Sequence, residues 1–416
     1  MIVDFTVNNY GPFRDTATLT MQASSLTGKE GNVMDVEQVK GGVLASSVVF
    51  GPNGAGKSYL FHAIKTLKAL TNDAYPKGTV YPGYLPFRLS EESLESPVGF
   101  RIRMIVNDIL HDYAVSYLDD HIVTETLHHY PKGRRATVFE RNGPGTFLKS
   151  KSNISKMTSE SSTYLAVGAK YNDPVCHAFW NALQKIIVID GNSLQNLAYS
   201  SCDYCSKNPE IKKLLIKGLS VADFGIKDYT YTEMDMDVQS LRNTVPPALL
   251  ERIEGTPRIK VLDEIFLVHD FPDCDVPEEY LSFPLEIESV GTRYMFGFMG
   301  PLADALLNGY TLMVDDFGSS LHPDINRWIV EQFSGDNNPN HAQLIVNTHD
   351  VGLMLDDGPL RRDQIWFVDK DRETGTAELY SLSDFKGIRK DTNILKAYLS
   401  GRYEAIPMII GRGVMR

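Results

Sequence analysis

The sequence predicts an α/β fold, in which a parallel sheet is joined to an antiparallel β subdomain and to an inserted mixed, largely helical subdomain. Three observations predict this fold. A β-branched strand, a glycine-rich loop and an apolar-faced helix follow one another over residues 43–70. Two further apolar strands, at residues 310–316 and 343–350, each end in polar side chains. Alternating apolar and polar residues over 98–117 predict antiparallel strands.

The N-terminal third of the chain supplies the antiparallel strands. Residues 2–7 and 16–21 alternate between apolar and polar, which predicts a hairpin before the glycine-rich loop. Residues 98–106 and 109–117 repeat the pattern, and the Asn-Asp pair between them favours a turn. The segment from about residue 86 to residue 147 therefore belongs to the β subdomain.

The glycine-rich loop carries the strongest chemical signal, because it has the complete Gly-x4-Gly-Lys-Ser spacing of a phosphate-binding loop. Its glycines let the backbone bend around a β-phosphate, Lys57 reaches the β- and γ-oxygens, and Ser58 reaches Mg²⁺. A glycine-rich turn without function is the alternative, but the flanking strand and helix favour nucleotide binding. The predicted ligands of ATP in this loop are Gly51, Asn53, Gly54, Ala55, Gly56, Lys57 and Ser58.

The middle of the chain has mixed periodicity. It predicts a helix over 173–185, a strand over 186–190 and a helix over 209–219. No heptad pattern lasts more than a few turns, which excludes a long coiled-coil arm. The predicted division of the chain is an N-terminal part at 1–150, an inserted subdomain at 151–280 and a C-terminal part at 281–416.

Two strand ends supply the candidate catalytic side chains. The first ends in Asp315 and Asp316, where one acid holds the Mg²⁺ shell and the next polarises the attacking water. We expect Asp315 in the metal role and Asp316 in the role of base. The second strand ends at His349, at the end suited to contact a γ-phosphate or the water. An Asp-Asp or a Thr-His pair at the end of a single strand is more typical of a surface cap. The order of the two pairs after a phosphate loop favours a catalytic role instead.

A further anion site is predicted just upstream of the acids. Ser289 and Gly291 precede an apolar-faced helix at about residues 294–307. A Ser-x-Gly at a helix N-terminus presents a hydroxyl, free N–H groups and the positive end of the helix dipole together. The alternative is an ordinary helix cap.

Composition limits the class of protein. The 416 residues suggest two or three domains, and 43% hydrophobic residues suffice for a large core. Apolar runs are too short for a membrane span, and the acidic strand at the N-terminus is no signal peptide, so we expect a cytoplasmic protein and no membrane partner. A net charge of −12 disfavours broad nucleic-acid binding. Two arginine pairs, at 134–135 and 361–362, leave open a local basic groove or a solvated surface.

The four cysteines do not form a disulfide framework in a chain of this length, which fits a reducing compartment. Cys202 and Cys205 form a Cys-x-x-Cys pair. A metal site would need further ligands, for which Cys176, His177 and Cys274 are the candidates. Two ordinary thiols are the favoured interpretation.

The ordered set of phosphate loop, Ser289-Val290-Gly291, Asp315-Asp316 and His349 is similar to the ABC-type ATPases of the SMC/RecF/OLD branch. This resemblance implies a P-loop ABC-ATPase head. It also implies a homodimer, or a higher even oligomer, in which two heads sandwich two ATP molecules. Ser289 and Gly291 would then act in trans on the γ-phosphate held by the partner's loop.

Finer features resemble the AAA-type ATPases of bacterial anti-phage abortive-infection loci, of the RloA and AbiLi type, with the PARIS ATPase AriA as a relative. They are residues 288–292, residues 319–323 and the terminal segment 398–407. That resemblance implies a head that senses infection and controls a separate effector, a toxin or a TOPRIM-type nuclease. DNA or a phage protein would be a further partner. Residues 151–280 carry no motif of the family.

The chain departs from the family at two points. Aspartate stands at 316 where the family has glutamate, which implies slow turnover because the base is shorter. No glutamine loop is evident, and Arg88 is the residue that would stand near the nucleotide instead. Asp369-Lys370-Asp371 resembles a TOPRIM Asp-x-Asp, but capping of the preceding strand is the favoured interpretation.

Two other functions stay open as hypotheses. One is a DNA-repair or recombination ATPase of the RecF/SMC type that clamps DNA across its dimer and whose affinity for DNA depends on the bound nucleotide. The other is an energy-coupling subunit of a membrane transporter. The loop around Ser289 departs from the transporter signature, which disfavours the second hypothesis.

Overall fold

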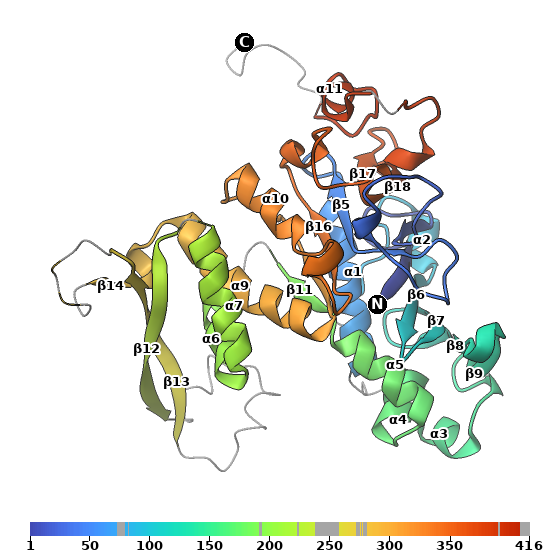
Figure 1. Cartoon of the computed structure of the whole chain (residues 1–416). Coiled ribbons are helices and arrows are strands. Elements are labelled where there is room, and N and C mark those ends of the chain that lie inside the picture. The colour runs from blue at the N-terminus through green and yellow to red at the C-terminus, as the bar shows by residue number, and fades with distance from the viewer. Residues whose placement is uncertain are drawn as a thin grey trace, which may run out of the picture. The chain divides into compact units, whose positions relative to one another are not determined.

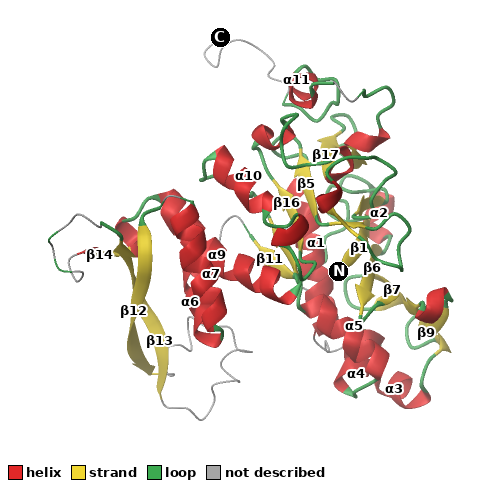
Figure 2. Ribbon diagram, in the orientation of Figure 1, coloured by secondary structure: helices red, strands yellow, loops and turns green. Residues whose placement is uncertain are grey.

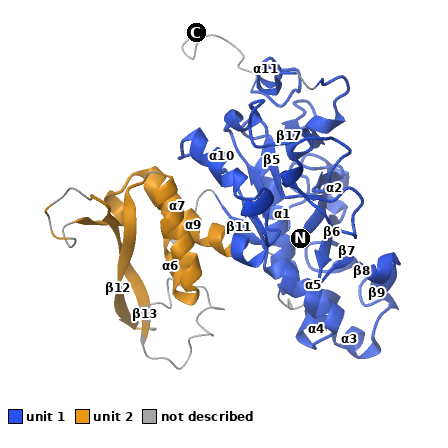
Figure 3. Ribbon diagram, in the orientation of Figure 1, with its two compact units in different colours: residues 1–191, 305–416 blue, residues 192–304 orange. Residues whose placement is uncertain are grey.

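The chain folds into two compact units, which Figure 3 colours separately. The first unit comprises Met1–Gly191 together with Ala305–Arg416, and the second comprises Asn192–Asp304. The structure, a computed structural model, describes residues 1–72, 80–81, 83–190, 194–222, 224–237, 258–271, 275, 277, 281–389 and 392–407.

A six-stranded sheet forms the centre of the first unit (Figure 2). Its strand order is β11-β15-β16-β5-β17-β18, and every neighbouring pair is parallel except β17 and β18. All residues of β5, β15 and β16 are buried, which is why these strands are continuous apolar runs. The predicted parallel sheet is confirmed. Its strands are β11 (Ile187–Ile189), β15 (Thr311–Val314), β16 (Gln343–Asn347), β5 (Ser46–Phe50), β17 (Ile365–Lys370) and β18 (Ala377–Ser381).

A seven-stranded antiparallel sheet forms the β subdomain, in the order β10-β9-β8-β7-β6-β1-β2. Burial alternates along β6, as expected for a sheet with two unlike faces. The predicted bounds of β6 and β7 are confirmed. The strands are β1 (Ile2–Asn8), β2 (Ala17–Thr20), β6 (Val98–Val106), β7 (Ile109–Tyr117), β8 (Ile122–His129), β9 (Ala136–Asn142) and β10 (Phe147–Lys149), and a separate pair joins β3 (Val33–Met34) to β4 (Val43–Leu44).

The helices of the first unit explain why residues 151–191 belong to it. Helix α1 contacts α4, α5 and β11, and β11 in turn pairs with β15 (Figure 1). The first compact unit therefore continues to Gly191, because α4 and α5 contact α1 and β11 pairs with β15, while the predicted limit of the insert at 151 stays a prediction. The helices are α1 (Lys57–Asn72), α2 (Glu91–Glu95), α3 (Ser152–Met157), α4 (Tyr164–Lys170), α5 (Pro174–Gln184), α10 (Pro323–Glu331) and α11 (Ile394–Leu399).

The second unit is mixed, with three helices and a three-stranded antiparallel sheet among its described residues. Ser201 ties two of the helices together, because its hydroxyl donates to the Gly297 carbonyl (2.6 Å) and accepts from the Gly300 N–H (3.0 Å). The unit therefore extends to Asp304, beyond the predicted end of the insert at 280. Its elements are α6 (Leu194–Lys207), α7 (Pro209–Val221), β12 (Ile226–Asp237), β13 (Arg258–His269), β14 (Ser282–Pro284) and α9 (Val290–Asn308), which continues past the boundary.

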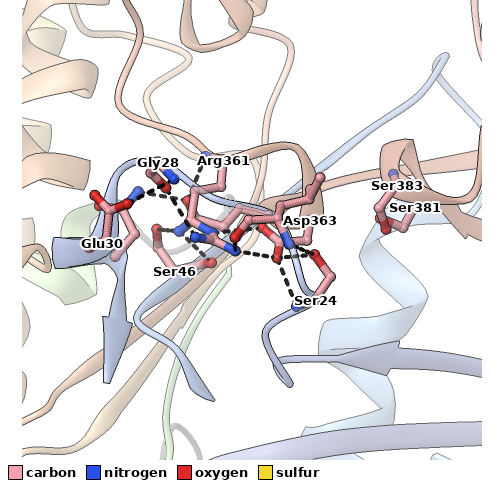
Figure 4. Close-up of polar contacts among 11 residues, drawn as sticks. Ser24, Gly28, Glu30, Ser46, Arg361, Asp363, Ser381 and Ser383 are labelled. Carbon is pink, nitrogen blue, oxygen red and sulfur yellow. Dashed lines mark hydrogen bonds and ion pairs between the residues drawn. The ribbon is translucent and has the colours of Figure 1, made fainter. Parts of the chain in front are cut away.

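The two arginine pairs differ from each other, and Arg361 fits neither interpretation of the sequence. Figure 4 shows Arg361 in an internal ion pair with Asp363. The side chain of Arg361 is only 5% exposed, so it belongs neither to a basic groove nor to a solvated surface. Arg362 donates to the Ile388 carbonyl oxygen (2.8 Å). Arg134 and Arg135 are exposed.

The described cysteines are buried thiols. Cys202 and Cys205 both lie on α6, and burial raises the pKa of Cys202 to about 12 and also raises that of Cys205. A raised pKa disfavours the thiolate that a metal ion requires. Cys274, the remaining candidate ligand, lies outside the described residues. No helix in the described part of the chain combines the length and apolarity that crossing a membrane requires.

Candidate nucleotide-binding site

The glycine-rich loop joins β5 to α1, in the order that the sequence predicts. A Cβ atom on Gly51 would lie 2.2 Å from the Val368 carbonyl oxygen of the neighbouring strand. A Cβ atom on Gly56, whose φ is +118°, would lie 2.6 Å from the Pro12 ring. The loop is therefore packed so closely against β17 and the first hairpin that only glycine fits at these two positions.

Lys57 begins α1, and its side chain turns back over the loop. Its Nζ donates to the carbonyl oxygens of Gly51 (2.8 Å) and Pro52 (3.2 Å), and the residue is 8% exposed. Burial lowers the pKa of Lys57, while the charges of Asp316 and Asp315 oppose that shift. The loop lysine and the two predicted catalytic acids therefore share one electrostatic environment.

The two acids follow β15 and are held by a residue that the sequence did not single out. Asp315 is half-buried, whereas Asp316 is exposed and has a left-handed backbone with φ +56°. The Asn347 side-chain amide donates to Asp315 Oδ1, and its Oδ1 accepts from the Asp316 N–H (2.8 Å). The available signal was an amide as the last residue of a strand whose three central residues are apolar.

His349 lies directly beside the loop lysine. Its Nε2 is 3.3 Å from Lys57 Nζ. Burial and the Lys57 charge lower the pKa of His349, with Asp316 acting in the opposite direction, so the imidazole is neutral at pH 7. The preceding Thr348 donates to the Phe317 carbonyl oxygen (2.8 Å), which joins the end of β16 to the turn after β15.

The residues predicted to hold Mg²⁺ have suitable chemistry for it. Ser58 offers a hydroxyl oxygen and Asp315 a carboxylate oxygen, and both are hard ligands. No group of three or more His, Cys, Asp or Glu side chains suited to a metal exists within the described ranges. Mg²⁺ is commonly held by one or two carboxylates together with substrate phosphates.

A cavity of about 940 Å³ opens beside the loop. Its walls include the loop residues Gly51–Ala55, His349, residues 369–373 at the end of β17 and in the turn after it, and part of a C-terminal segment, which we define as residues 394–407. This volume lies within the range of about 300–1,000 Å³ for small-ligand sites. Leu89 lines the cavity, whereas its neighbour Arg88 is exposed and is absent from the lining.

The C-terminal segment is anchored to β17. Tyr398 stacks on Phe367 with ring centroids 5.4 Å apart, and Tyr403 lies 5.9 Å from the same ring. The Tyr398 hydroxyl donates to the Ala405 carbonyl oxygen (2.9 Å). Residues 398–407, which the sequence singled out, therefore form part of the wall of the candidate site.

The Asp369-Lys370-Asp371 motif has a local structural role. Asp371 Oδ1 accepts from the backbone N–H groups of Glu373 (3.1 Å) and Thr374 (2.6 Å). Asp369 Oδ2 accepts from the Ala405 N–H (3.3 Å). These bonds support the interpretation of the motif as a cap of the strand and its turn.

Ser289 and Gly291 belong to the second unit and lie at the start of α9. The Ser289 hydroxyl accepts from the Thr292 N–H (3.1 Å), so this serine does cap the helix. Ser289 is exposed, and its neighbours Ile287 and Val290 are 69% and 47% exposed. An anion-binding role for Ser289 and Gly291 stays a prediction.

Comparison with protein families finds a match in the second half of the chain. A family described as "AAA domain, putative AbiEii toxin, Type IV TA system" matches residues 255–356. The matched stretch is about a quarter of the chain and contains Ser289, Gly291, Asp315, Asp316 and His349, while the phosphate loop lies outside it. No curated protein matches the chain.

Several solved structures resemble the chain distantly. An SMC head bound to the C-winged helix domain of ScpA is 12% identical with a TM-score of 0.46, over 91% of this chain and 97% of that one. The SMC head domain from Thermotoga maritima is 12% identical with a TM-score of 0.41, over 91% and 98%. The recombination mediator protein RecF is 10% identical with a TM-score of 0.37, over 91% and 98%.

Proposed function

We propose that the protein is an ATPase of the ABC type, which binds ATP in the glycine-rich loop and hydrolyses it. One observation carries the proposal. The buried loop lysine, Lys57, lies 3.3 Å from His349 and shares its electrostatic environment with Asp315 and Asp316. Residues from three separate strand ends therefore meet at the loop, where the carboxyl ends of parallel strands form a ligand site.

The side chains divide the chemistry between them. Lys57 and the loop N–H groups neutralise and orient the phosphates. Asp316 polarises the attacking water, and the neutral His349 contacts the γ-phosphate or that water. Ser58 and Asp315 would hold Mg²⁺, which when bound supplies charge stabilisation to the phosphates.

The active form is a homodimer, or a higher even oligomer, that sandwiches ATP. Ser289 and Gly291 of one head complete the site around the γ-phosphate held by the other head's Lys57. Support comes from the exposed position of Ser289 at the start of a long helix, where the positive end of the helix dipole favours an anion. ATP then joins two heads that are otherwise weakly associated.

The biological role that we infer is control of a separate effector in anti-phage defence, in the cytoplasm. Support comes from the AbiEii-toxin description of the matching family and from the RloA- and AbiLi-like residues 398–407. The effector would be a toxin or a TOPRIM-type nuclease, and DNA or a phage protein would be the trigger. Turnover that DNA ends or gaps stimulate, with salt-sensitive binding, would favour the DNA-repair hypothesis instead.

ATP binding by Lys57→Ala tests the proposal. Removing a buried charged partner of the phosphates should cost about 2 kcal/mol or more, which is a loss of about 30-fold or more in affinity. Lys65→Ala is the matched control, since Lys65 lies on the same helix and pairs with Asp190 instead. Titration calorimetry with Mg-ATP measures both variants. Unchanged affinity in Lys57→Ala would contradict the assignment of the loop.

A further inference from the structure

Asn347 makes a two-sided contact with the neighbouring acids. It is the last residue of β16 and is 2% exposed. Its Nδ2 donates to Asp315 Oδ1, and its Oδ1 accepts from the Asp316 N–H (2.8 Å). A carboxamide is the side chain of this length that offers a donor and an acceptor together. Asn347 therefore engages a side-chain oxygen of one acid and the backbone of the next.

The register of two parallel strands creates this contact. Val314 pairs with Val346 at the end of the β15–β16 ladder, so Asp315, directly after β15, and Asn347, the last residue of β16, lie side by side. The contact therefore depends on long-range pairing.

Two more bonds fix the turn that carries the base. The Phe317 N–H donates to the Asn347 carbonyl oxygen (2.8 Å), and the Thr348 hydroxyl donates to the Phe317 carbonyl oxygen (2.8 Å). Both bonds hold Phe317, and the preceding Asp316 has the left-handed backbone, φ +56°, which costs about 1–2 kcal/mol for a residue with a side chain. Such a conformation persists where the surrounding bonds over-determine it.

We propose that Asn347 is the positioning residue that gives the two adjacent carboxylates different roles. Its amide engages one oxygen of Asp315, which leaves the other oxygen for Mg²⁺. Its carbonyl holds the backbone of Asp316, which keeps that carboxylate exposed beside Lys57 and available to water. The inference rests on the proposed ATPase function and adds to it a residue that acts through Asp315 and Asp316.

Two substitutions separate the two bonds. In Asn347→Leu the new side chain is similar in size to asparagine, and both the bond to Asp315 and the bond from the Asp316 N–H are lost. Asn347→Asp keeps an acceptor for the Asp316 N–H but places a second negative charge against Asp315. A merely structural asparagine would give both variants the same kind of defect.

The first readout uses the protein without nucleotide or metal. Amide hydrogen exchange at Asp316 should accelerate by about tenfold or more in Asn347→Leu, since the N–H loses its acceptor, and should stay near the wild-type rate in Asn347→Asp. ATP affinity measured without Mg²⁺ should be the same in all three proteins, because the loop is intact. Asn347→Ser replaces the leucine variant if that protein does not fold.

The second readout is the Mg²⁺ dependence of turnover. We expect kcat to fall about 10- to 100-fold in both variants, as for other residues that orient a metal ligand. The Mg²⁺ concentration for half-saturation should rise in Asn347→Leu, because Asp315 loses its anchor. It should fall in Asn347→Asp, because the added charge attracts the cation.

Equal Mg²⁺ half-saturation and kcat in wild type and both variants would overturn the positioning role, and so would shifts in the same direction. Failure of the underlying function is distinguishable from this result. Wild-type protein that binds no ATP, or that binds it regardless of Lys57→Ala, contradicts the ATPase proposal itself. Normal wild-type turnover with unaffected Asn347 variants contradicts only the inference about Asn347.

Discussion

At the scale of single residues, the backbone at Asp316 favours aspartate over glutamate at this position. The residue has φ +56°, and aspartate tolerates this region better than glutamate because its short carboxylate bonds to nearby backbone. The shorter base and the left-handed turn are therefore linked. A change at this position should affect both stability and turnover.

Asp316→Glu and Asp316→Asn separate these effects. The glutamate should lower the free energy of unfolding by about 1 kcal/mol, from the left-handed backbone, and raise turnover, because it reaches further toward the water. Asparagine tolerates the same backbone, so Asp316→Asn should keep wild-type stability and lose about 100-fold or more in kcat, trapping the ATP-bound form. Urea unfolding and phosphate release measure the two quantities. Normal hydrolysis by Asp316→Asn would mean that another group is the base.

At the scale of elements, the hydroxyl of Tyr398 should stabilise the C-terminal segment, whereas the hydroxyl of Tyr403 should contribute little. Tyr398→Phe removes the bond to the Ala405 carbonyl oxygen (2.9 Å). It should lower the free energy of local opening of the segment by about 1 kcal/mol, so that a protease cleaves the segment about five times faster. Tyr403→Phe is the matched control, because the buried Tyr403 hydroxyl has no hydrogen-bond partner among the described residues. Equal proteolysis of the two variants would show that the Tyr398 bond contributes nothing.

The buried pair of Arg361 and Asp363 should make stability depend on pH (Figure 4). Burial alone would raise the Asp363 pKa, but the bonds from Arg361 and from Ser24 outweigh it and lower the pKa below its ordinary value of 3.8. A lowered pKa contributes stability that is present above pH 3.8 and lost as the pH falls through the folded-state pKa.

Asp363→Asn should therefore be less stable than wild type by about 3 kcal/mol at neutral pH, because Arg361 keeps a buried charge without its partner. The difference in the free energy of unfolding between wild type and Asp363→Asn should become smaller as the pH falls below 3.8. Asp15→Asn is the control, since Asp15 pairs with Arg14 at an exposed site and should change little at any pH. Urea unfolding across this pH range measures all three proteins. If Asp363→Asn is less stable than wild type by the same amount at every pH, the charge of Asp363 does not stabilise the fold.

Features encoded by contiguous residues could be predicted from the sequence, whereas features that depend on tertiary contacts could not. The loop was predicted because its ligands are contiguous, and β6 and β7 because alternation is local. Asn347 was missed because its role depends on the register between β15 and β16, which no local pattern encodes. Arg361 was misassigned because charge along the chain does not reveal the buried partner that the fold supplies.

At the scale of the whole molecule, the division of the chain was the least predictable feature. The predicted limits at 150 and 280 followed changes in periodicity, whereas the compact units change at 191–192 and 304–305. The difference arises from tertiary contacts: β11 joins the central sheet through β15, and Ser201 binds α6 to α9. Lys57, Asp315 and His349 consequently belong to the first unit, whereas Ser289 belongs to the second.

The central claim is that each active site is made by two heads, and mixing two inactive variants tests it most directly. Lys57→Ala removes the loop lysine and keeps Ser289, whereas Ser289→Arg should bind ATP normally but fail to dimerise with itself and stay inactive. A mixed dimer has one complete site, made by the loop of Ser289→Arg and the Ser289 of Lys57→Ala. Phosphate release should therefore be near background for each variant alone and recover toward half of the wild-type value on mixing, rising with protein concentration. A mixture as inactive as its components, with wild-type turnover independent of concentration, would contradict the two-head site.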